Sequence, residues 1–154
     1  MRLALYQPDI PQNVGAAIRV AACFGAGLDI IHPCGFPLKA PEISRVAMDY
    51  GALAPPRAHD GWHDFQSAAA PARTILLTTR GDSLLWDFRF RADDILLMGR
   101  ESAGVPDDVH ESADARVAIP LAAGARSLNI AVAAAVALAE ARRQTGWTPN
   151  LDQT

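Results

Sequence analysis

Ile119-Pro-Leu-Ala-Ala-Gly-Ala-Arg-Ser-Leu-Asn-Ile-Ala-Val132 is the stretch that decides the fold of this chain. It begins at the end of a short apolar strand, passes through a loop of small residues and continues into a long Ala-rich helix. The loop presents the polar side chains of Arg126, Ser127 and Asn129 where the helix begins. Free backbone N–H groups at a helix N-terminus favour electron-rich ligand atoms. The sequence therefore predicts a ligand site at this junction.

Two earlier segments have the same strand–loop–helix construction. Pro11-Gln-Asn-Val-Gly-Ala-Ala-Ile-Arg19 follows the first predicted strand, and Leu97-Met-Gly-Arg-Glu-Ser-Ala-Gly-Val-Pro106 spans the end of a later one. Each segment carries glycine and a few polar groups, as the C-terminal junction does. Three junctions of this kind predict one composite site.

Strands and helices are expected to alternate along the chain. The expected strands are Arg2–Tyr6, Leu28–His32, Thr74–Thr79, Asp94–Met98 and Arg116–Ile119. The expected helices are Asn13–Phe24, Glu42–Asp49, Gly61–Ala70, Pro106–Ser112 and Ser127–Gln144. We expect an irregular segment at Ala54–Arg57 and a segment of mixed structure at Ser83–Phe90. Because the strands are continuous apolar runs, this α/β pattern is typical of a mainly parallel sheet with helices on both faces.

Length and composition favour one globular domain over residues 1–154, with a polar tail at Gly146–Thr154 that we expect to fray. A net charge of -3 argues against nucleic-acid binding by bulk charge, although it leaves room for a local basic surface. The cysteines Cys23 and Cys34 form neither a disulfide framework nor a metal site, so we expect no metal. The apolar run Ile130–Ala139 is too short to span a bilayer, and no signal-peptide pattern opens the chain; we expect a cytoplasmic protein without membrane contact.

In their order and spacing, the three junctions resemble the three motifs of the SPOUT class of RNA 2′-O-ribose methyltransferases. The motif segments are residues 11–19, 97–104 and 119–129, and the resemblance covers nearly the whole chain. We expect no extra RNA-binding domain beside these motifs, which is similar to the short TrmL branch that methylates the wobble nucleotide of certain tRNAs. The segments Tyr6-Gln-Pro-Asp-Ile-Pro-Gln-Asn13 and Met48-Asp-Tyr50 also resemble that branch.

This resemblance implies properties that periodicity does not reveal. The implied fold is an α/β knot, in which the C-terminal segment forms a trefoil knot. The implied cofactor is S-adenosylmethionine, and the implied assembly is a homodimer with its active site near the subunit interface. The implied reaction is methylation of the ribose 2′-hydroxyl of nucleotide 34, a cytidine or modified uridine, in the tRNA anticodon loop.

The resemblance also assigns roles to individual residues. The positions that match the cofactor-lining residues, or are added to them as neighbours, are Leu77, Met98, Gly99, Gly104, Ile119, Leu121, Ser127 and Leu128. The positions that match the catalytic centre are Asn13, Arg19, Glu101, Ser127 and Asn129. Two departures bear on the target nucleotide: the short branch often has Pro where this chain has Arg100, and an Asp-Ser pair in place of Gly124-Ala125.

Physical chemistry narrows some of these roles. A guanidinium stays protonated, so Arg19 suits a phosphate contact and stabilisation of the developing alkoxide better than proton removal. Proton loss through Glu101, through water or at Arg19 itself stays open. Structural alternatives also stay open: Asn13 or Ser127 as a helix cap, Arg19 as a surface residue, and Glu101 paired with an arginine. Glycines 99 and 104 are compatible with a tight turn as well as with cofactor binding.

Other positions have simpler interpretations. The histidines His59, His63 and His110 lie among polar residues and are expected to be solvated. The apolar face of the last helix is expected to serve the core or a dimer interface; it comprises Ile130, Ala133, Ala134, Ala137 and Leu138.

Three alternative functions remain at the level of sequence. One is 2′-O-methylation of another tRNA or rRNA nucleotide. A second is a Rossmann-like nucleotide-binding oxidoreductase, which is disfavoured because no Gly-x-Gly-x-x-Gly follows the first strand. A third is a non-catalytic RNA-binding module, which has no need of Asn13, Glu101, Ser127 and Asn129 together.

Overall fold

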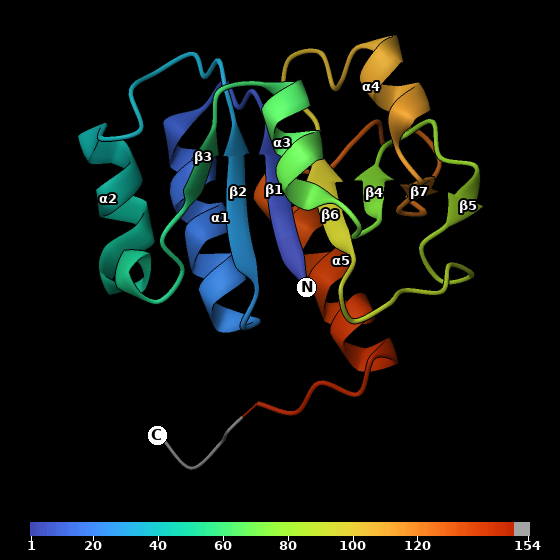
Figure 1. Cartoon of the computed structure of the whole chain (residues 1–154). Helices are drawn as coiled ribbons and strands as arrows, with labels where there is room; N and C mark the ends of the chain where they lie inside the picture. The colour runs from blue at the N-terminus through green and yellow to red at the C-terminus, as the bar shows by residue number, and fades with distance from the viewer. Residues whose placement is uncertain (150–154) are drawn as a thin grey trace.

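The computed structural model describes residues 1–149 as an α/β fold. The strands are β1 (Arg2–Tyr6), β2 (Gly27–Ile31), β3 (Arg57–His59), β4 (Thr74–Leu77), β5 (Ser83–Leu84), β6 (Ile95–Met98) and β7 (Ala115–Ala118). They form one sheet in the order β3-β2-β1-β6-β4-β7-β5, and every pairing is parallel (Figure 1). The expectation of a mainly parallel sheet is confirmed.

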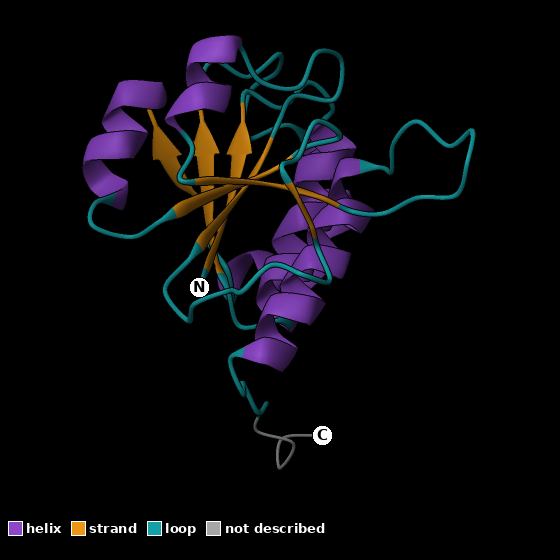
Figure 2. Cartoon of the chain, turned by 90° about the vertical axis from the view of Figure 1, so that its right-hand side faces the viewer, coloured by secondary structure: helices purple, strands orange, loops and turns teal. Residues whose placement is uncertain are grey.

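Helices cover both faces of this sheet (Figure 2). The helices are α1 (Pro11–Cys23), α2 (Pro41–Ala47), α3 (Trp62–Ala69), α4 (Asp107–Ser112) and α5 (Ile130–Gln144), with a 3-10 helix η1 (Met48–Ala52) after α2. Residues of α1, α2 and α5 share one apolar core, and residues of α3 and α4 share the other. No helix within residues 1–149 is both long and apolar enough to cross a membrane.

The two cores explain why the central strands are continuously apolar. In β1, Leu3 and Leu5 enter the core under α1 and α5, whereas Ala4 and Tyr6 enter the core under α3 and α4. Successive side chains of a strand point to opposite faces, so a sheet covered on both sides needs an apolar residue at every position. The fully buried strand β6 follows the same rule, and β4 follows it after its first residue, Thr74.

Helix α1 begins two residues earlier than expected and packs closely on α2. Pro11 occupies the first turn, where its missing N–H costs nothing, and Ile10 is the N-cap without a side-chain cap bond. The interpretation of Asn13 as a cap is therefore wrong, because Asn13 lies inside the helix. Gly15 faces α2 so closely that an added Cβ would lie 2.7 Å from the carbonyl oxygen of Ile43.

Two elements differ from the sequence expectation at their ends. The last helix begins at Ile130 rather than Ser127, because Asn129 is its N-cap and accepts hydrogen bonds from the backbone N–H groups of Ala131 and Val132. Residues 119–129 form a mostly exposed loop between β7 and α5, which extends outward from the helix layer (Figure 2). Strand β3 replaces part of the expected irregular segment and adds an edge to the sheet beside β2.

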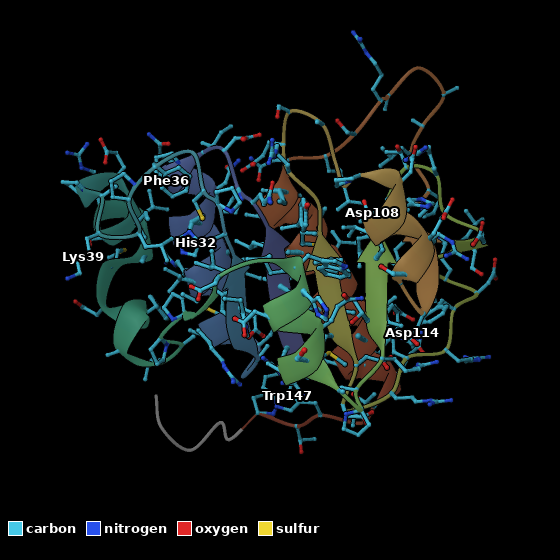
Figure 3. The ribbon with its side chains drawn as sticks, turned by 45° about the horizontal axis from the view of Figure 1, so that its top comes forward. His32, Phe36, Lys39, Asp108, Asp114 and Trp147 are labelled. Carbon is cyan, nitrogen blue, oxygen red and sulfur yellow. The ribbon has the colours of Figure 1, made fainter. Side chains whose placement is uncertain are left out.

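The C-terminal tail is partly packed rather than frayed. Trp147 lies at the opposite end of the molecule from the loop 119–129 (Figure 3). Its ring centroid is 6.5 Å from that of Phe24, and the Arg142 guanidinium lies 5.0 Å from its ring centroid. The remaining part of the expected frayed tail, residues 150–154, lies outside the described residues.

Candidate active site

A cavity of about 570 Å³ opens at the carboxyl ends of β4, β6 and β7. Most of its walls come from residues 76–80, residues 98–105 and part of the loop 119–129, namely Ile119, Leu121 and residues 126–129. The lining is completed by Ile10, Asn13, His110, Val117, Ile130 and Ala133. Every position that the sequence assigned to cofactor lining is on these walls, namely Leu77, Met98, Gly99, Gly104, Ile119, Leu121, Ser127 and Leu128. The predicted convergence of the later two junctions is thus present in the fold, and the roles of these residues remain a proposal.

Strand register brings these walls together. Leu77 pairs with Met98 across β4 and β6, and with Val117 across β4 and β7. Three parallel strands therefore end at the same level, and the loops that follow them meet at one edge. Ligands of open parallel sheets bind outside the carboxyl ends of the strands, where this cavity lies.

The turn after β6 depends on its glycines. The backbone N–H of Arg100 donates to the Gly104 carbonyl and the N–H of Gly104 donates to the Arg100 carbonyl, both at 2.8 Å. Gly104 has φ +69°, and a Cβ on Gly99 would lie 2.8 Å from the Gly104 carbonyl carbon. A tight turn and a cofactor wall are therefore compatible roles for these two residues.

A chain of hydrogen bonds links the three junctions at the rim of the cavity. Asn129 Nδ2 donates to Asn13 Oδ1 at 2.9 Å, and Asn13 Nδ2 donates to Glu101 Oε1 at 2.9 Å. Asn129 Oδ1 accepts from the backbone N–H of Ala131 at 2.9 Å. The backbone donors at one end and the carboxylate at the other fix which way both amides point. Each amide keeps a second N–H for which the described residues provide no acceptor.

Glu101 uses both carboxylate oxygens in this arrangement. Its Oε1 accepts from Asn13, and its Oε2 accepts from the backbone N–H of Asp9 at 2.8 Å. Each carboxylate oxygen has a further lone pair, so Glu101 can still accept a proton. The alternative of Glu101 paired with an arginine is not what the structure has, since its hydrogen-bond donors are an amide and a backbone N–H.

Arg19 lies apart from the other residues assigned to the catalytic centre. It is exposed on α1 and is not among the described residues that line the cavity. Its guanidinium lies 5.2 Å from the Tyr50 ring centroid, and its Nη1 lies 3.5 Å from Met48 Sδ. Arg19 follows Asn13 by six positions, which turns their side chains about 240° apart around an ideal helix. The expected separation of the two side chains is present, although Asn13 lies within α1 and not in the loop before it.

Ser127 lines the cavity as an exposed residue of the loop. The alternative that Ser127 caps the last helix is wrong, because the Asn129 side chain makes the cap bonds. Arg126 of the same loop also lines the cavity, and its neighbours in the loop are exposed.

Sequence reasoning missed two histidines with buried ring nitrogens, one of which lines the cavity. His110 lines the cavity, and its Nε2 is buried with no hydrogen-bond partner within the part of the chain described, so the expectation of a solvated side chain is wrong. His59 is also buried, and its Nε2 lies 2.7 Å from Asp29 Oδ1. A buried His interacting with a side chain thirty residues away leaves no local pattern in a sequence.

The described residues offer neither a reactive thiolate at Cys34 nor a cluster of metal-ligating side chains. Burial, assisted by the charge of Glu101, raises the pKa of Cys34 to about 11 and keeps it a neutral thiol. Residues 1–149 contain no group of three His, Cys, Asp or Glu side chains placed to hold a metal ion.

A family model for SpoU rRNA methylases matches residues 1–139. The chain belongs to the SpoU methylase family. It is 51% identical to a tRNA (cytidine(34)-2′-O)-methyltransferase of Ancylobacter novellus, over 95% of this chain and 94% of the relative. It is 52% identical to a protein of the same name from Beijerinckia indica, over 94% and 91% of the two chains.

Solved structures agree with this membership of the SpoU family. A structure that describes 2-OH methylation of C/U34 on tRNA superposes with a TM-score of 0.89 and 42% identity, over 93% of this chain and 94% of that one. The SpoU methyltransferase AviRb from Streptomyces viridochromogenes, in complex with AdoMet, gives a TM-score of 0.83 and 30% identity over 94% of this chain and 60% of that one. The family predicted from the three motifs is confirmed, and it displaces the oxidoreductase alternative.

Proposed function

We propose that this protein transfers a methyl group from S-adenosylmethionine to the ribose 2′-hydroxyl of nucleotide 34 in the anticodon loop of tRNA. The observation that carries the proposal is the cavity at the ends of β4, β6 and β7 with Asn13, Glu101 and Asn129 hydrogen-bonded at its rim. The names of the relatives that match over more than nine-tenths of both chains support the choice of nucleotide.

The residues of the cavity fit S-adenosylmethionine. The cavity volume of about 570 Å³ falls within the range of roughly 300–1,000 Å³ typical of small-molecule sites. Apolar side chains suit an adenine ring, whereas exposed backbone groups at the strand ends suit its polar edge; the apolar residues are Leu77, Met98, Ile119, Leu121 and Leu128. The AdoMet-bound structure of a SpoU relative supports the same cofactor.

The chain's own residues would align and activate the ribose. When bound, S-adenosylmethionine supplies an electrophilic methyl carbon on a sulfonium. The second N–H groups of Asn13 and Asn129 hold the ribose oxygen at the rim, and such alignment is worth up to roughly 7–11 kcal/mol. Glu101 accepts the hydroxyl proton, directly or through a water molecule, at an oxygen that already orients Asn13. Arg19 holds the adjacent phosphate and stabilises the developing alkoxide.

A homodimer would bring Arg19 to this centre. Large apolar side chains are exposed at the N-terminal ends of α1 and α5, where Ile10 is 41% exposed and Val132 is 49% exposed. Exposed apolar residues that gather on one side of a molecule favour an interface. We propose that this face pairs with its copy and that Arg19 of one subunit serves the cavity of the other.

We also propose that the segment after β7 passes through an earlier loop to form a trefoil knot. Support comes from the cavity walls, since segments 76–80, 98–105 and 119–129 surround one space. It comes as well from α5, which packs on α1 and β6 after leaving β7, two strands away from β6 in the sheet.

The decisive experiment is methylation of unmodified tRNA by the purified protein, with the product mapped by mass spectrometry. We expect a 2′-O-methyl group at nucleotide 34. Methylation at a different nucleotide would support the second candidate, another tRNA target, for which Arg100 and Gly124-Ala125 are the sequence grounds. Calorimetry that detects tight binding of a nicotinamide dinucleotide, and none of S-adenosylmethionine, would refute both.

A further inference from the structure

We propose that Asp9 is a positioning residue, which fixes the Glu101 carboxylate at the active centre by clamping the residues on both sides of Glu101. This inference rests on the proposed methyl transfer, in which Glu101 orients Asn13 and accepts the proton. Asp9 lies in the loop between β1 and α1, ninety-two residues from Glu101 along the chain.

The first part of the clamp is a set of hydrogen bonds between Asp9 and Ser102. The Asp9 Oδ2 accepts from the backbone N–H of Ser102 at 3.1 Å and from its hydroxyl at 2.5 Å. A carboxylate that accepts from a backbone N–H and a hydroxyl of one residue restrains both its main chain and its side chain. Ser102 directly follows Glu101, so these bonds restrain the backbone on one side of the carboxylate.

The second part of the clamp acts through Arg100, the residue before Glu101. Its Nε lies 3.7 Å from Asp9 Oδ1, and its Nη2 donates to the side-chain oxygen of Gln7. Gln7 has φ +44°, a left-handed conformation that is rare for a residue with a Cβ, and strain of this kind is concentrated at functional sites. Gln7 is held there by its backbone N–H, which donates to the Ile31 carbonyl at 2.9 Å.

Asp9 also reaches the carboxylate itself through its main chain. Its backbone N–H donates to Glu101 Oε2 at 2.8 Å, which leaves Oε1 to accept from Asn13. One residue therefore restrains Glu101 by three routes: the residue before it, the residue after it and its own carboxylate. This arrangement also accounts for Arg100, whose guanidinium is committed to Gln7 and Asp9.

The two glycines assigned to cofactor lining, Gly99 and Gly104, are held independently of the clamp. The turn from Gly99 to Gly104 is closed by its own pair of Arg100–Gly104 backbone bonds. Removing the Asp9 side chain should leave that turn closed while it frees the orientation of Glu101. A merely structural Asp9 would instead change cofactor affinity and stability together with activity.

The first test measures methylation and cofactor binding separately in Asp9→Ala, Asp9→Asn and the control Asp87→Ala, an exposed acid on the segment after β5. We expect kcat to fall at least tenfold in Asp9→Ala, with the Kd for S-adenosylmethionine within twofold of wild type. Asp9→Asn keeps an oxygen that accepts from Ser102 and should recover most of the loss, whereas Asp87→Ala should match wild type. Wild-type kcat in Asp9→Ala would overturn the proposal.

The second test is a double-mutant cycle with Glu101→Ala. If Asp9 acts by positioning Glu101, then Asp9→Ala should change kcat less than twofold once Glu101 is already absent. If Asp9→Ala lowers kcat by the same factor with and without Glu101, the positioning role is overturned. If Asp9→Ala fails to fold, Ser102→Ala, which removes only the hydroxyl bond, takes its place in the same cycle. A wild-type protein without methylating activity would refute the proposed function itself, an outcome separate from failure of the clamp.

Discussion

Asn129 combines two functions in one side chain. Its oxygen caps α5 through the N–H groups of Ala131 and Val132, and its nitrogen donates to Asn13. The helix cap therefore sets the polarity of the chain that ends at Glu101. Only a substitution that keeps the cap and removes the hydrogen bond to Asn13 can separate the structural role of Asn129 from the role proposed for it in methyl transfer.

Asn129→Asp makes that separation. An aspartate accepts the two backbone N–H bonds and is a good N-cap, but it cannot donate to Asn13. We expect the free energy of unfolding to stay within about 0.5 kcal/mol of wild type while methylation falls at least tenfold. Asn129→Ala should lose methylation and also about 1 kcal/mol of stability. Urea denaturation and a methylation assay measure the two effects, and an active Asn129→Asp would exclude the amide chain from catalysis.

Arg19 provides a second prediction at the scale of one residue. Its guanidinium contacts the Tyr50 ring at an exposed position. Arg19→Ala should therefore lower the free energy of unfolding by no more than about 1 kcal/mol. We expect this variant to lose methylation while its affinity for S-adenosylmethionine survives. Arg19→Lys should keep part of the activity, because a point charge remains although the bidentate fork is lost. Wild-type methylation by Arg19→Ala would make it an ordinary surface residue.

The residues of the site were predictable to the extent that they belong to local motifs. The cavity-lining residues, together with Asn13, Glu101 and Asn129, follow strands, and parallel strands bring such positions to one edge. The contacts of Asp9 and the place of His110 in the cavity lining escaped prediction, because both depend on residues far away in the chain. The sequence leaves open whether Ser127 caps α5, because both serine and asparagine suit an N-cap, and the backbone path gives that role to Asn129.

At the scale of the elements, β3 shows where sequence patterns fail. Arg57, Ala58 and His59 carry no apolar run, yet they pair with β2 at the edge of the sheet. Asp29 of β2 stabilises this pairing; it is a buried acidic side chain in a strand whose other buried residues are apolar. Asp29 accepts from the Arg2 guanidinium of β1 and lies 2.7 Å from His59 Nε2 of β3, so one carboxylate joins three strands. Such pairing depends on neighbours that are not adjacent in sequence.

Removal of this carboxylate should destabilise the sheet edge. Asp29→Ala leaves the partly exposed Arg2 guanidinium and the buried His59 without their hydrogen-bond partner, and an unsatisfied buried polar group costs about 1–3 kcal/mol. We expect a loss of that size in the free energy of unfolding, measured by urea denaturation. Asp60→Ala, at an exposed position one residue from His59, is the matched control and should change stability by less than about 0.5 kcal/mol. An equal effect of both substitutions would contradict the role given to Asp29.

At the scale of the whole molecule, the proposed dimer makes a prediction about one exposed face. Val132 is 49% exposed at the N-terminal end of α5, and Leu84 is 47% exposed on the edge strand β5. Val132→Asp places a carboxylate at a helix N-terminus, where it favours folding, yet buries a charge in the proposed interface. We expect light scattering to find a monomer with little methylation activity. Leu84→Asp, matched in exposure, should remain dimeric and active.

The same assembly determines which chain supplies Arg19. If Arg19 of one subunit serves the cavity of the other, a mixed dimer of an Arg19→Ala subunit and a Glu101→Ala subunit contains one site with both residues intact. Equal mixing should then restore about a quarter of wild-type activity, since half of the dimers are mixed and each has one working site. If Arg19 serves its own chain, every site lacks one residue and the mixture stays inactive. Subunits refolded together from denaturant and assayed on tRNA distinguish these outcomes, and an inactive mixture that light scattering finds dimeric would disprove the shared site.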